Sequence, residues 1–256
     1  MRGSCLCGSV VFEADGPRHE VSLCHCRQCR QQSGHLWAAS SVPLARFRLV
    51  EDRGLRWYRA SATAERGFCA GCGAFLLWKP EGQDRMAIAA GALDGPTGLA
   101  VGRQIHTDEA GDYYNPLGPP GEPTPAGVLH GACACGANRL TLKGPMGAVT
   151  ACHCHQCRKL SGHFAASFEA DAAAITWQAR DEATFTTPGG GTRGFCPGCG
   201  TSLWFRAADG AFSLEAGLID NPTGGRLARH IFVADKGDYY TLDDGLPQFA
   251  GDMTAP

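Results

Sequence analysis

Long hydrophobic runs are absent from this sequence of 256 residues. A membrane-spanning helix needs about 18 or more consecutive apolar residues, and no stretch of the chain approaches that length. The first segment, MRGSCLCGSVVFEADG, also lacks the apolar core of a secretory signal peptide. We therefore expect a soluble, cytoplasmic protein without a membrane partner.

Charge is scarce and nearly balanced. Charged residues make up 19% of the chain, below the ~25% that is usual in soluble proteins. Lys and Arg number 23 and Asp and Glu number 25, which gives a formal net charge of −2. Proteins that bind nucleic acids generally carry a basic excess. The composition therefore predicts no nucleic-acid partner.

Cysteine, in contrast, is abundant. The fourteen cysteines form two sets of seven with nearly the same spacing, and none is left over. In a cytosolic chain of this length, such clusters more often bind metal or perform chemistry than form disulfides. The first set is Cys5, Cys7, Cys24, Cys26, Cys29, Cys69 and Cys72, and the second is Cys133, Cys135, Cys152, Cys154, Cys157, Cys196 and Cys199.

The sequence between the cysteines repeats as well. CHCRQCRQQSGH returns as CHCHQCRKLSGH, RGFCAGCG returns as RGFCPGCG, and GDYY occurs twice. The chain is therefore a tandem duplication. Five of the thirteen residues at 115–127 are proline, which is typical of a semi-rigid linker. We predict a first module at 1–114, this linker, and a second module at 128–256.

Each module is predicted to be all-β. Short alternating runs, such as 9–13 and 203–206, are separated by Gly and Pro, which indicates short strands and turns. No segment has a long apolar period of 3.6 residues. The best helical candidate is a single turn at 30–32, with a counterpart after Cys157. Bound metal would compensate for the small core of each module.

The outer cysteines of each module have the spacing of zinc knuckles. A C-x-x-C-G turn lets two sulfurs reach one metal, and a second pair from elsewhere in the module completes a closed tetrahedral site. We therefore predict two structural zinc sites. One consists of Cys5, Cys7, Cys69 and Cys72, and the other of Cys133, Cys135, Cys196 and Cys199.

The central cysteines provide three ligands within six residues, which leaves a fourth position open for water or a ligand, as in catalytic zinc sites. The predicted open sites are Cys24, Cys26 and Cys29, and Cys152, Cys154 and Cys157. Two alternatives remain: disulfides, or a purely structural site closed by a histidine among His25, His35, His153, His155 and His163. Zinc is the expected cofactor, with two ions per module and four per chain.

Several other residues have interpretations of their own. Arg30 and Arg158 follow the last central cysteine and are placed to offset its charge. Asp94 and Asp220 lie beside turn signals and are interpreted as turn or cap residues. Four tryptophans are expected in the core: Trp57, Trp78, Trp177 and Trp204.

The motifs G-S-C-x-C-G, C-H-C-x-x-C-R-x-x-S-G and F-C-x-x-C-G, with the closing R-H-I-F-V and G-L-P-Q-F, resemble the glutathione-dependent formaldehyde-activating (GFA) family. The resemblance covers nearly all of both modules. It implies short coiled β-sheets with zinc knuckles, related to the methionine sulfoxide reductase B fold. It also implies a structural zinc on the outer cysteines and glutathione binding at the central ones. The implied reaction joins formaldehyde and glutathione to S-hydroxymethylglutathione, the reverse of a carbon–sulfur lyase.

The resemblance therefore predicts a zinc-dependent carbon–sulfur lyase that acts on adducts of an aldehyde with glutathione or a related thiol. A non-catalytic zinc module that binds a thiol ligand or a protein partner is the alternative, and another zinc- or thiol-based enzyme is a third. His25, His153 and His230 are candidate substrate contacts, while the sequence identifies no catalytic residue. Only the second copy has His230 and the tail 245–249, so we expect it to be the better ligand site if that tail closes the pocket. The alternative is that the tail only covers a sheet edge.

Overall fold

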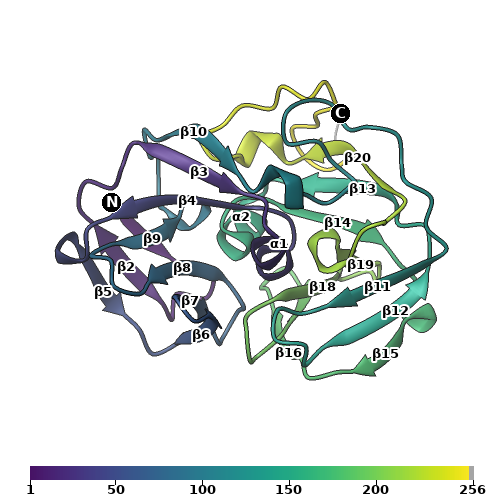
Figure 1. Ribbon diagram of the computed structural model, residues 1–256, viewed down its shortest axis with the longest axis horizontal. Coiled ribbons are helices and arrows are strands. Elements are labelled where there is room, and N and C mark those ends of the chain that lie inside the picture. The colour runs from purple at the N-terminus through teal and green to yellow at the C-terminus, as the bar shows by residue number, and fades with distance from the viewer. Residues whose placement is uncertain (254–256) are drawn as a thin grey trace.

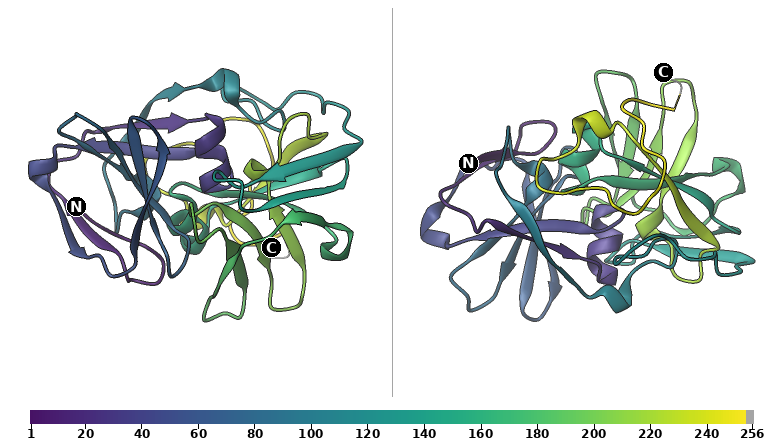
Figure 2. Two further views of the ribbon diagram at one scale, coloured as in Figure 1. Left: turned by 60° about the horizontal axis from the view of Figure 1, so that its bottom comes forward. Right: turned by 90° about the horizontal axis from the view of Figure 1, so that it is seen from above.

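The computed structural model describes residues 1–253; residues 254–256, the end of the predicted second module, lie outside the described part. Each half of the chain contains one three-stranded and one seven-stranded sheet. The two halves lie side by side, with the two short helices next to each other between them (Figures 1 and 2). No helix in residues 1–253 has the length and hydropathy that a membrane span requires.

In the first half, the small sheet is antiparallel, and β10 pairs in parallel with β3 at one edge of the large sheet. The small sheet has the order β1 (Arg2–Ser4), β2 (Val11–Ala14), β5 (Phe47–Glu51). The large sheet has the order β10 (Ala100–Ile105), β3 (Glu20–Cys24), β4 (Trp37–Val42), β9 (Met86–Ala89), β8 (Phe75–Pro80), β7 (Ala64–Cys69), β6 (Leu55–Ser61). The helical elements are α1 (Arg27–Ser33), η1 (Leu44–Arg46), η2 (Ala90–Ala92) and η3 (Thr107–Glu109).

The second half repeats this topology strand for strand. The small sheet has the order β11 (Val128–Ala132), β12 (Arg139–Lys143), β15 (Thr176–Ala179). The large sheet has the order β16 (Ala183–Thr186), β17 (Thr192–Phe195), β18 (Ser202–Arg206), β19 (Phe212–Glu215), β14 (Ala165–Glu169), β13 (Gly147–Cys152), β20 (Gly225–Ile231). The helical elements are α2 (His155–Ser161), η4 (Ala172–Ala174), η5 (Ala216–Leu218) and η6 (Val233–Asp235). The mostly β fold in two tandem modules is as predicted from the sequence.

The helix after each central cysteine cluster is longer than the single turn expected from the sequence. The first helix begins at Arg27 and includes Cys29, and the second begins at His155 and includes Cys157. At the start of the second helix, the Cys157 N–H donates to the Cys154 sulfur at 3.5 Å, whereas Cys26 makes no such cap in the first. The first helix ends at Gly34, whose φ of 87° requires glycine, since this left-handed conformation is costly for other residues.

Reciprocal hydrogen bonds join the two halves. The Gly91 N–H donates to Gly162 O at 2.8 Å, and the Gly217 N–H donates to Gly34 O at 2.7 Å. Each bond joins a 3-10 turn of one half to the helix C-terminus of the other. The buried apolar side chains accordingly form one cluster that spans both halves.

The two GDYY segments are exchanged between the halves. Asp112 accepts hydrogen bonds from the N–H and hydroxyl of Thr223, and Asp238 accepts the equivalent pair from Thr97. In the same way, Tyr113 O accepts from the Leu227 N–H, and the Tyr239 carbonyl accepts from the first half. Each half is therefore completed by a segment of the other.

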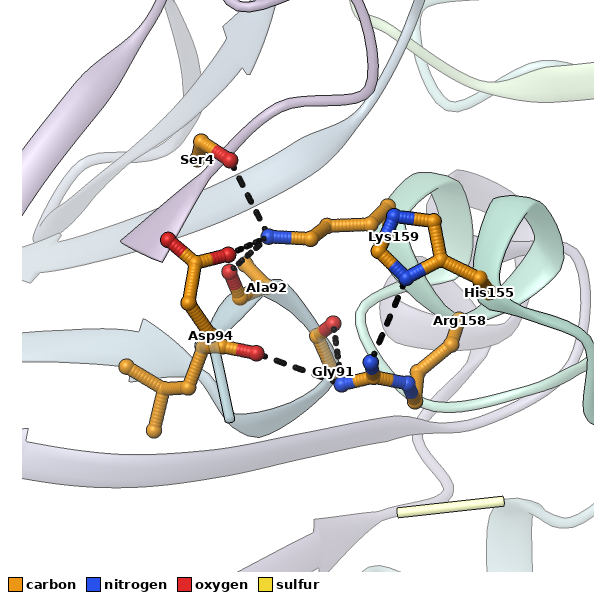
Figure 3. Close-up of polar contacts among 8 residues, drawn as sticks. Ser4, Gly91, Ala92, Asp94, His155, Arg158 and Lys159 are labelled. Atoms are coloured by element: carbon orange, nitrogen blue, oxygen red, sulfur yellow. Dashed lines mark hydrogen bonds and ion pairs between the residues drawn. The ribbon is translucent and has the colours of Figure 1, made fainter. Parts of the chain in front are cut away.

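A buried lysine adds a contact that breaks the symmetry. Lys159 of α2 donates to Ser4 Oγ at 3.0 Å and to Ala92 O at 2.7 Å, and forms an ion pair with Asp94 (Figure 3). Burial lowers the pKa of Lys159. In the other direction, Gln31 occupies the position of Lys159 and donates to Ala132 O at 2.9 Å, while Asp220 pairs with Arg27 from the start of α1. The interpretation of Asp94 and Asp220 as turn or cap residues was thus incomplete, because both carboxylates join the halves.

Candidate metal centres

The outer cysteines of each half meet as two four-cysteine groups. In the first half, the end of β7 brings its C-x-x-C turn against the loop after β1. The sulfurs of each group lie within 4.8 Å of one another, and all fourteen cysteines are free thiols. The groups contain the residues paired from the sequence: Cys5, Cys7, Cys69 and Cys72, and Cys133, Cys135, Cys196 and Cys199.

The central cysteines form two three-cysteine groups. In each, the first cysteine ends a strand of the large sheet, and the third lies in the first turn of the following helix. We call Cys24, Cys26 and Cys29 the first centre, and Cys152, Cys154 and Cys157 the second centre. Neither group includes a histidine or carboxylate within 4.8 Å of all its sulfurs, among the residues that the structure describes.

The sulfur spacing fits zinc. Four sulfurs at ~2.3 Å from a tetrahedral zinc ion lie about 3.8 Å from one another. The distance is 3.6 Å between Cys5 and Cys7, 3.6 Å between Cys7 and Cys69, and 3.6 Å between Cys24 and Cys26. The groups are therefore arranged to hold an ion with little rearrangement.

A buried arginine contacts each centre. Arg66 on β7 is 4% exposed, and its Nη1 donates to the Cys29 sulfur at 3.4 Å. Arg193 on β17 makes the same contact with Cys157. Three thiolates on a divalent ion leave one net negative charge, which a guanidinium offsets in a poorly solvated site. Arg66 and Arg193, rather than Arg30 and Arg158, are therefore the arginines that contact the central sulfurs.

Arg30 and Arg158 contact backbone carbonyls instead. The Arg30 Nε donates to Glu109 O at 3.1 Å, and Arg158 donates to the carbonyls of Gly91 and Leu93 in the other half (Figure 3).

The thiols of each centre share protons unequally. Hydrogen bonds from Cys24 and Cys29 hold the pKa of Cys26 well below its ordinary value, and Arg66 lowers it further. Hydrogen bonds with Cys26 and Cys29 raise the pKa of Cys24. Zinc binds thiolates, so a cluster that already favours one ionised sulfur is prepared for the metal.

A cleft of about 640 Å³ contains all three cysteines of the first centre. Its walls include Trp37 and Trp78, of which Trp37 is 4% exposed. Its rim carries the arginines Arg27, Arg85 and Arg103. A volume in this range suits a small organic ligand. The first centre therefore faces a space in which a ligand can approach the sulfurs.

His106 lines the same cleft, and its Nδ1 lies 3.3 Å from a carboxylate oxygen of Glu109. His106 has a φ of 56°, which is uncommon for a residue other than glycine. The corresponding residue of the second half is Phe232, with a φ of 54°. The unusual backbone is thus common to both halves, whereas the titratable side chain occurs only in the first.

The second centre differs from the first in the side chain that packs between it and the helix of the opposite half. A Cβ added at Gly162 would lie 2.6 Å from Trp37 Nε1, and one added at Gly34 would lie 2.7 Å from Glu215 Oε2. Glu215 therefore occupies the place of the Trp37 indole. It is 3% exposed, and burial raises its pKa to about 8. Its Oε1 accepts from the Ser202 hydroxyl, while Oε2 has no hydrogen-bond partner within residues 1–253.

The histidines proposed as substrate contacts are all buried. His25 bonds Tyr114 at 2.7 Å and Gln104 at 2.8 Å, and burial lowers its pKa to about 4. In the second half, hydrogen bonds connect Asp244, His230, His153 and Tyr240 in sequence. His25 and His230 line a separate cavity of about 510 Å³ between the halves. None of the three lines the cleft of the first centre.

The C-terminal tail pairs with the edge of the large sheet, and none of its residues lines the cleft of the first centre. Phe249 donates to His230 O at 2.9 Å, the His230 N–H donates to Pro247 O at 2.9 Å, and Gln248 forms a bridge with β20. Arg229 on the same strand lies 2.6 Å from the Met253 sulfur. The tail thus covers the edge strand β20 of the second half, as edge strands generally require.

Sequence reasoning missed Arg66, Arg193, Glu215 and the His106–Glu109 pair. One signal was present, because both arginines belong to the repeated RGFC motif. Trp57 was placed wrongly, since it is 38% exposed. The tryptophans that line the cleft of the first centre are Trp37 and Trp78.

Comparison with known proteins shows what the chain is similar to. The sequence profile of a family described as "Glutathione-dependent formaldehyde-activating enzyme" matches residues 1–109 and 128–235. The chain is 28% identical over 120 residues to an uncharacterized lyase of Schizosaccharomyces pombe, an alignment that covers 44% of this chain and 82% of the relative. A crystal structure of a Rhodobacter sphaeroides protein is 23% identical and aligns with a TM-score of 0.36, covering 41% of this chain and all of the other. The matched regions include both sets of cysteines, and the chain belongs to the glutathione-dependent formaldehyde-activating enzyme family.

Proposed function

We propose that the chain is a zinc-dependent carbon–sulfur lyase that acts on adducts of glutathione with an aldehyde, of the S-hydroxymethylglutathione type. The observation that carries this proposal is the position of the first centre, whose three sulfurs line a cleft of about 640 Å³. The family description and the lyase name of the yeast relative support the same reaction class.

The cysteine groups would hold four zinc ions, two on the four-cysteine groups and two on the centres. Zinc bound at a centre would keep a thiol ligand deprotonated near neutral pH. Arg66 would then act in two ways. It would offset the negative charge of the Cys29 thiolate, and it would lower the pKa of Cys26 and so disfavour its protonation. Trp37 forms a wall that limits water around the sulfurs.

The reaction needs one proton transfer. When the thiolate sulfur attacks the aldehyde carbon, a carbon–sulfur bond forms and the carbonyl π electrons move to oxygen, which takes up a proton. In the lyase direction, that hydroxyl loses its proton as the carbon–sulfur bond breaks. We assign this transfer to His106, which lines the cleft and is oriented by Glu109. His25, His153 and His230 could contact only a molecule in or beside the cavity between the halves.

The second centre favours the alternative function. Phe232 replaces His106 there, so the proposed proton donor is missing at that position. This observation supports a role for the second centre in binding a thiol without turning it over.

The test is a turnover assay with glutathione and ¹³C-formaldehyde, followed by NMR exchange at equilibrium with zinc-loaded protein. We expect exchange faster than the spontaneous rate, and its loss in Cys26→Ser. His106→Phe should reduce the protein-dependent rate by about 10²-fold, typical of a lost general acid–base. Because Phe232 already adopts the same backbone conformation, this variant should fold normally.

Two results would contradict the proposal. One is an exchange rate equal to that without protein. The other, which concerns His106 alone, is an unchanged rate in His106→Phe. The matched control is Phe232→Leu, which we expect to leave the rate unchanged.

A further inference from the structure

We propose that the two centres select different thiols: the first takes thiols that carry carboxylates, and the second does not favour them. This inference rests on the proposed function, since it specifies the ligand of the same centres. It depends on the charges around each centre, which the duplication allows us to compare position by position.

Arg85 is the residue that best fits a carboxylate. It lines the cleft of the first centre, and its guanidinium lies 5.0 Å from the centre of the Trp78 ring. Gln83 and Ser41 hold it with side-chain hydrogen bonds of 2.8 Å and 3.3 Å. Within residues 1–253, no carboxylate forms an ion pair with it. The guanidinium is therefore held in place without a negative partner.

The neighbours of Arg85 are positive as well. Burial lowers the pKa of Arg85, and the charges of Arg18 and Arg103 lower it further. Arg103 lines the cleft and pairs with Glu20 at 3.0 Å, and Arg27 pairs with Asp220. Both remain more than half exposed and can also reach a ligand.

The balance of charge in the cleft is positive. Four arginines line it, Arg66 included, and Glu109 is the one carboxylate among the lining residues. Glu20 and Asp220 pair with Arg103 and Arg27 from outside this lining, and Arg66 contacts the Cys29 sulfur, so Arg85 is the arginine left without an anionic partner among the described residues. Glu109 is already engaged by His106 and by the Arg27 N–H. In a half-enclosed cleft, such a field attracts anions, and arginine forms strong charge-assisted hydrogen bonds with carboxylates.

The second centre differs in several of these charges. The strand register aligns Trp78 and Ala87 with Phe205 and Ser213, so Arg85 corresponds to Ala211. By the same register, Ser41 corresponds to Glu169. Arg27 corresponds to His155, the first residue of the equivalent helix. A cation is lost at Ala211, and a carboxylate is gained at Glu169.

One arginine position is conserved between the two halves, which gives a matched pair of variants. Arg103 and Arg229 occupy the same position on β10 and β20, paired with Ser22 and Thr150. Arg103 lies in the cleft, whereas Arg229 contacts Met253 of the tail. Substituting Arg103 and Arg229 in separate variants therefore distinguishes the loss of a direct contact with the ligand from the loss of one positive charge in general.

The experiment is calorimetric titration of the zinc-loaded full chain with two thiols at pH 7. Glutathione carries two carboxylates, and 2-mercaptoethanol carries none. Cys154→Ser leaves the first centre intact and should retain the glutathione affinity of the unmodified protein. Cys26→Ser leaves only the second centre and should weaken glutathione binding at least tenfold, while 2-mercaptoethanol binds both variants with affinities within threefold.

The charge variants test the assignment directly. Arg85→Gln and Arg103→Gln should each weaken glutathione binding about tenfold, as expected for one lost charge-assisted hydrogen bond, and change 2-mercaptoethanol binding less than twofold. Arg229→Gln should change neither. The double variant Glu169→Ser and Ala211→Arg should strengthen glutathione binding at the second centre.

The outcomes distinguish this inference from the proposed function. If neither thiol binds the zinc-loaded protein, the proposed function is wrong and the inference with it. If both thiols bind but glutathione has equal affinity for the two centres, only the inference is overturned. An equal loss of affinity in Arg229→Gln and Arg103→Gln would likewise overturn it.

Discussion

At the scale of single residues, the two halves keep the same sulfurs and differ in what lies beside them. Trp37 in the first half and Glu215 in the second fill equivalent places against the helix of the opposite half. An indole there makes the floor of the first centre apolar. Burying the Glu215 carboxyl, whose Oε2 lacks a partner among the described residues, costs free energy of folding, and this cost is larger when the carboxyl is ionised.

Glu215→Gln should change the pH dependence of stability. The pKa of Glu215 is raised from 4.5 to about 8 in the folded protein by burial. Between these values, the unfolded chain has released the proton and the folded chain still holds it, so stability falls as pH rises. The variant should remove this decline and be more stable at pH 8 by a few kcal/mol, on the order expected for such a shift.

The measurement is urea unfolding of both proteins from pH 5 to pH 9 with saturating zinc. Since zinc binding is common to both proteins, the difference between them isolates Glu215. Parallel stability curves would show that the carboxyl is not buried as described.

At the scale of elements, the contact that matters most is between each short helix and the 3-10 turn of the other half. The backbones approach closely there, because a Cβ at Gly217 would lie 2.6 Å from the carbonyl carbon of Gly34 and closer still to Arg30 O. A rigid backbone cannot move away as a flexible side chain can. Glycine is therefore required at this contact for space rather than for its backbone angles.

Gly217→Ala should destabilise the protein by roughly 1–3 kcal/mol, as overpacking commonly does. It would also lengthen the 2.7 Å hydrogen bond between the Gly217 N–H and Gly34 O. Thermal unfolding checks this expectation. The control is Gly121→Ala, since a Cβ there meets nothing within 4 Å. Similar melting temperatures for the two variants would contradict the close approach.

The elements also show what the sequence could predict. Short strands and cysteine clusters follow from local spacing, so the mostly β fold and the grouping of sulfurs were within reach. Arg66 was not, because its contact with Cys29 depends on β7 packing against α1, between residues 37 positions apart. The exchange of the GDYY segments was also beyond reach, since a repeated motif does not tell which copy it packs against.

At the scale of the whole molecule, two similar halves share one apolar core and bear four cysteine groups. The four-cysteine groups would enclose their ion with protein ligands alone. The centres leave one position to water or a ligand, so their ions should dissociate more readily.

The purified protein should contain four zinc ions per chain, and a chelator should remove two of them first. We expect the fold to survive this first step and to be lost with the second pair, because closed sites contribute folding free energy. Metal analysis combined with circular dichroism during chelation tests both points. A plateau at two ions before any chelator is added would contradict zinc at the centres.

The reciprocal exchange of residues 111–114 and 237–240 has a consequence for how such a chain can evolve. An assembly of two identical subunits receives every mutation twice, so its paired sites must change together. In a fused duplicate, each mutation falls on one copy, while the crossed segments keep the copies dependent on each other for folding. Selection can therefore retain one half as a partner for folding while the other acquires a new preference, and neither half can be discarded.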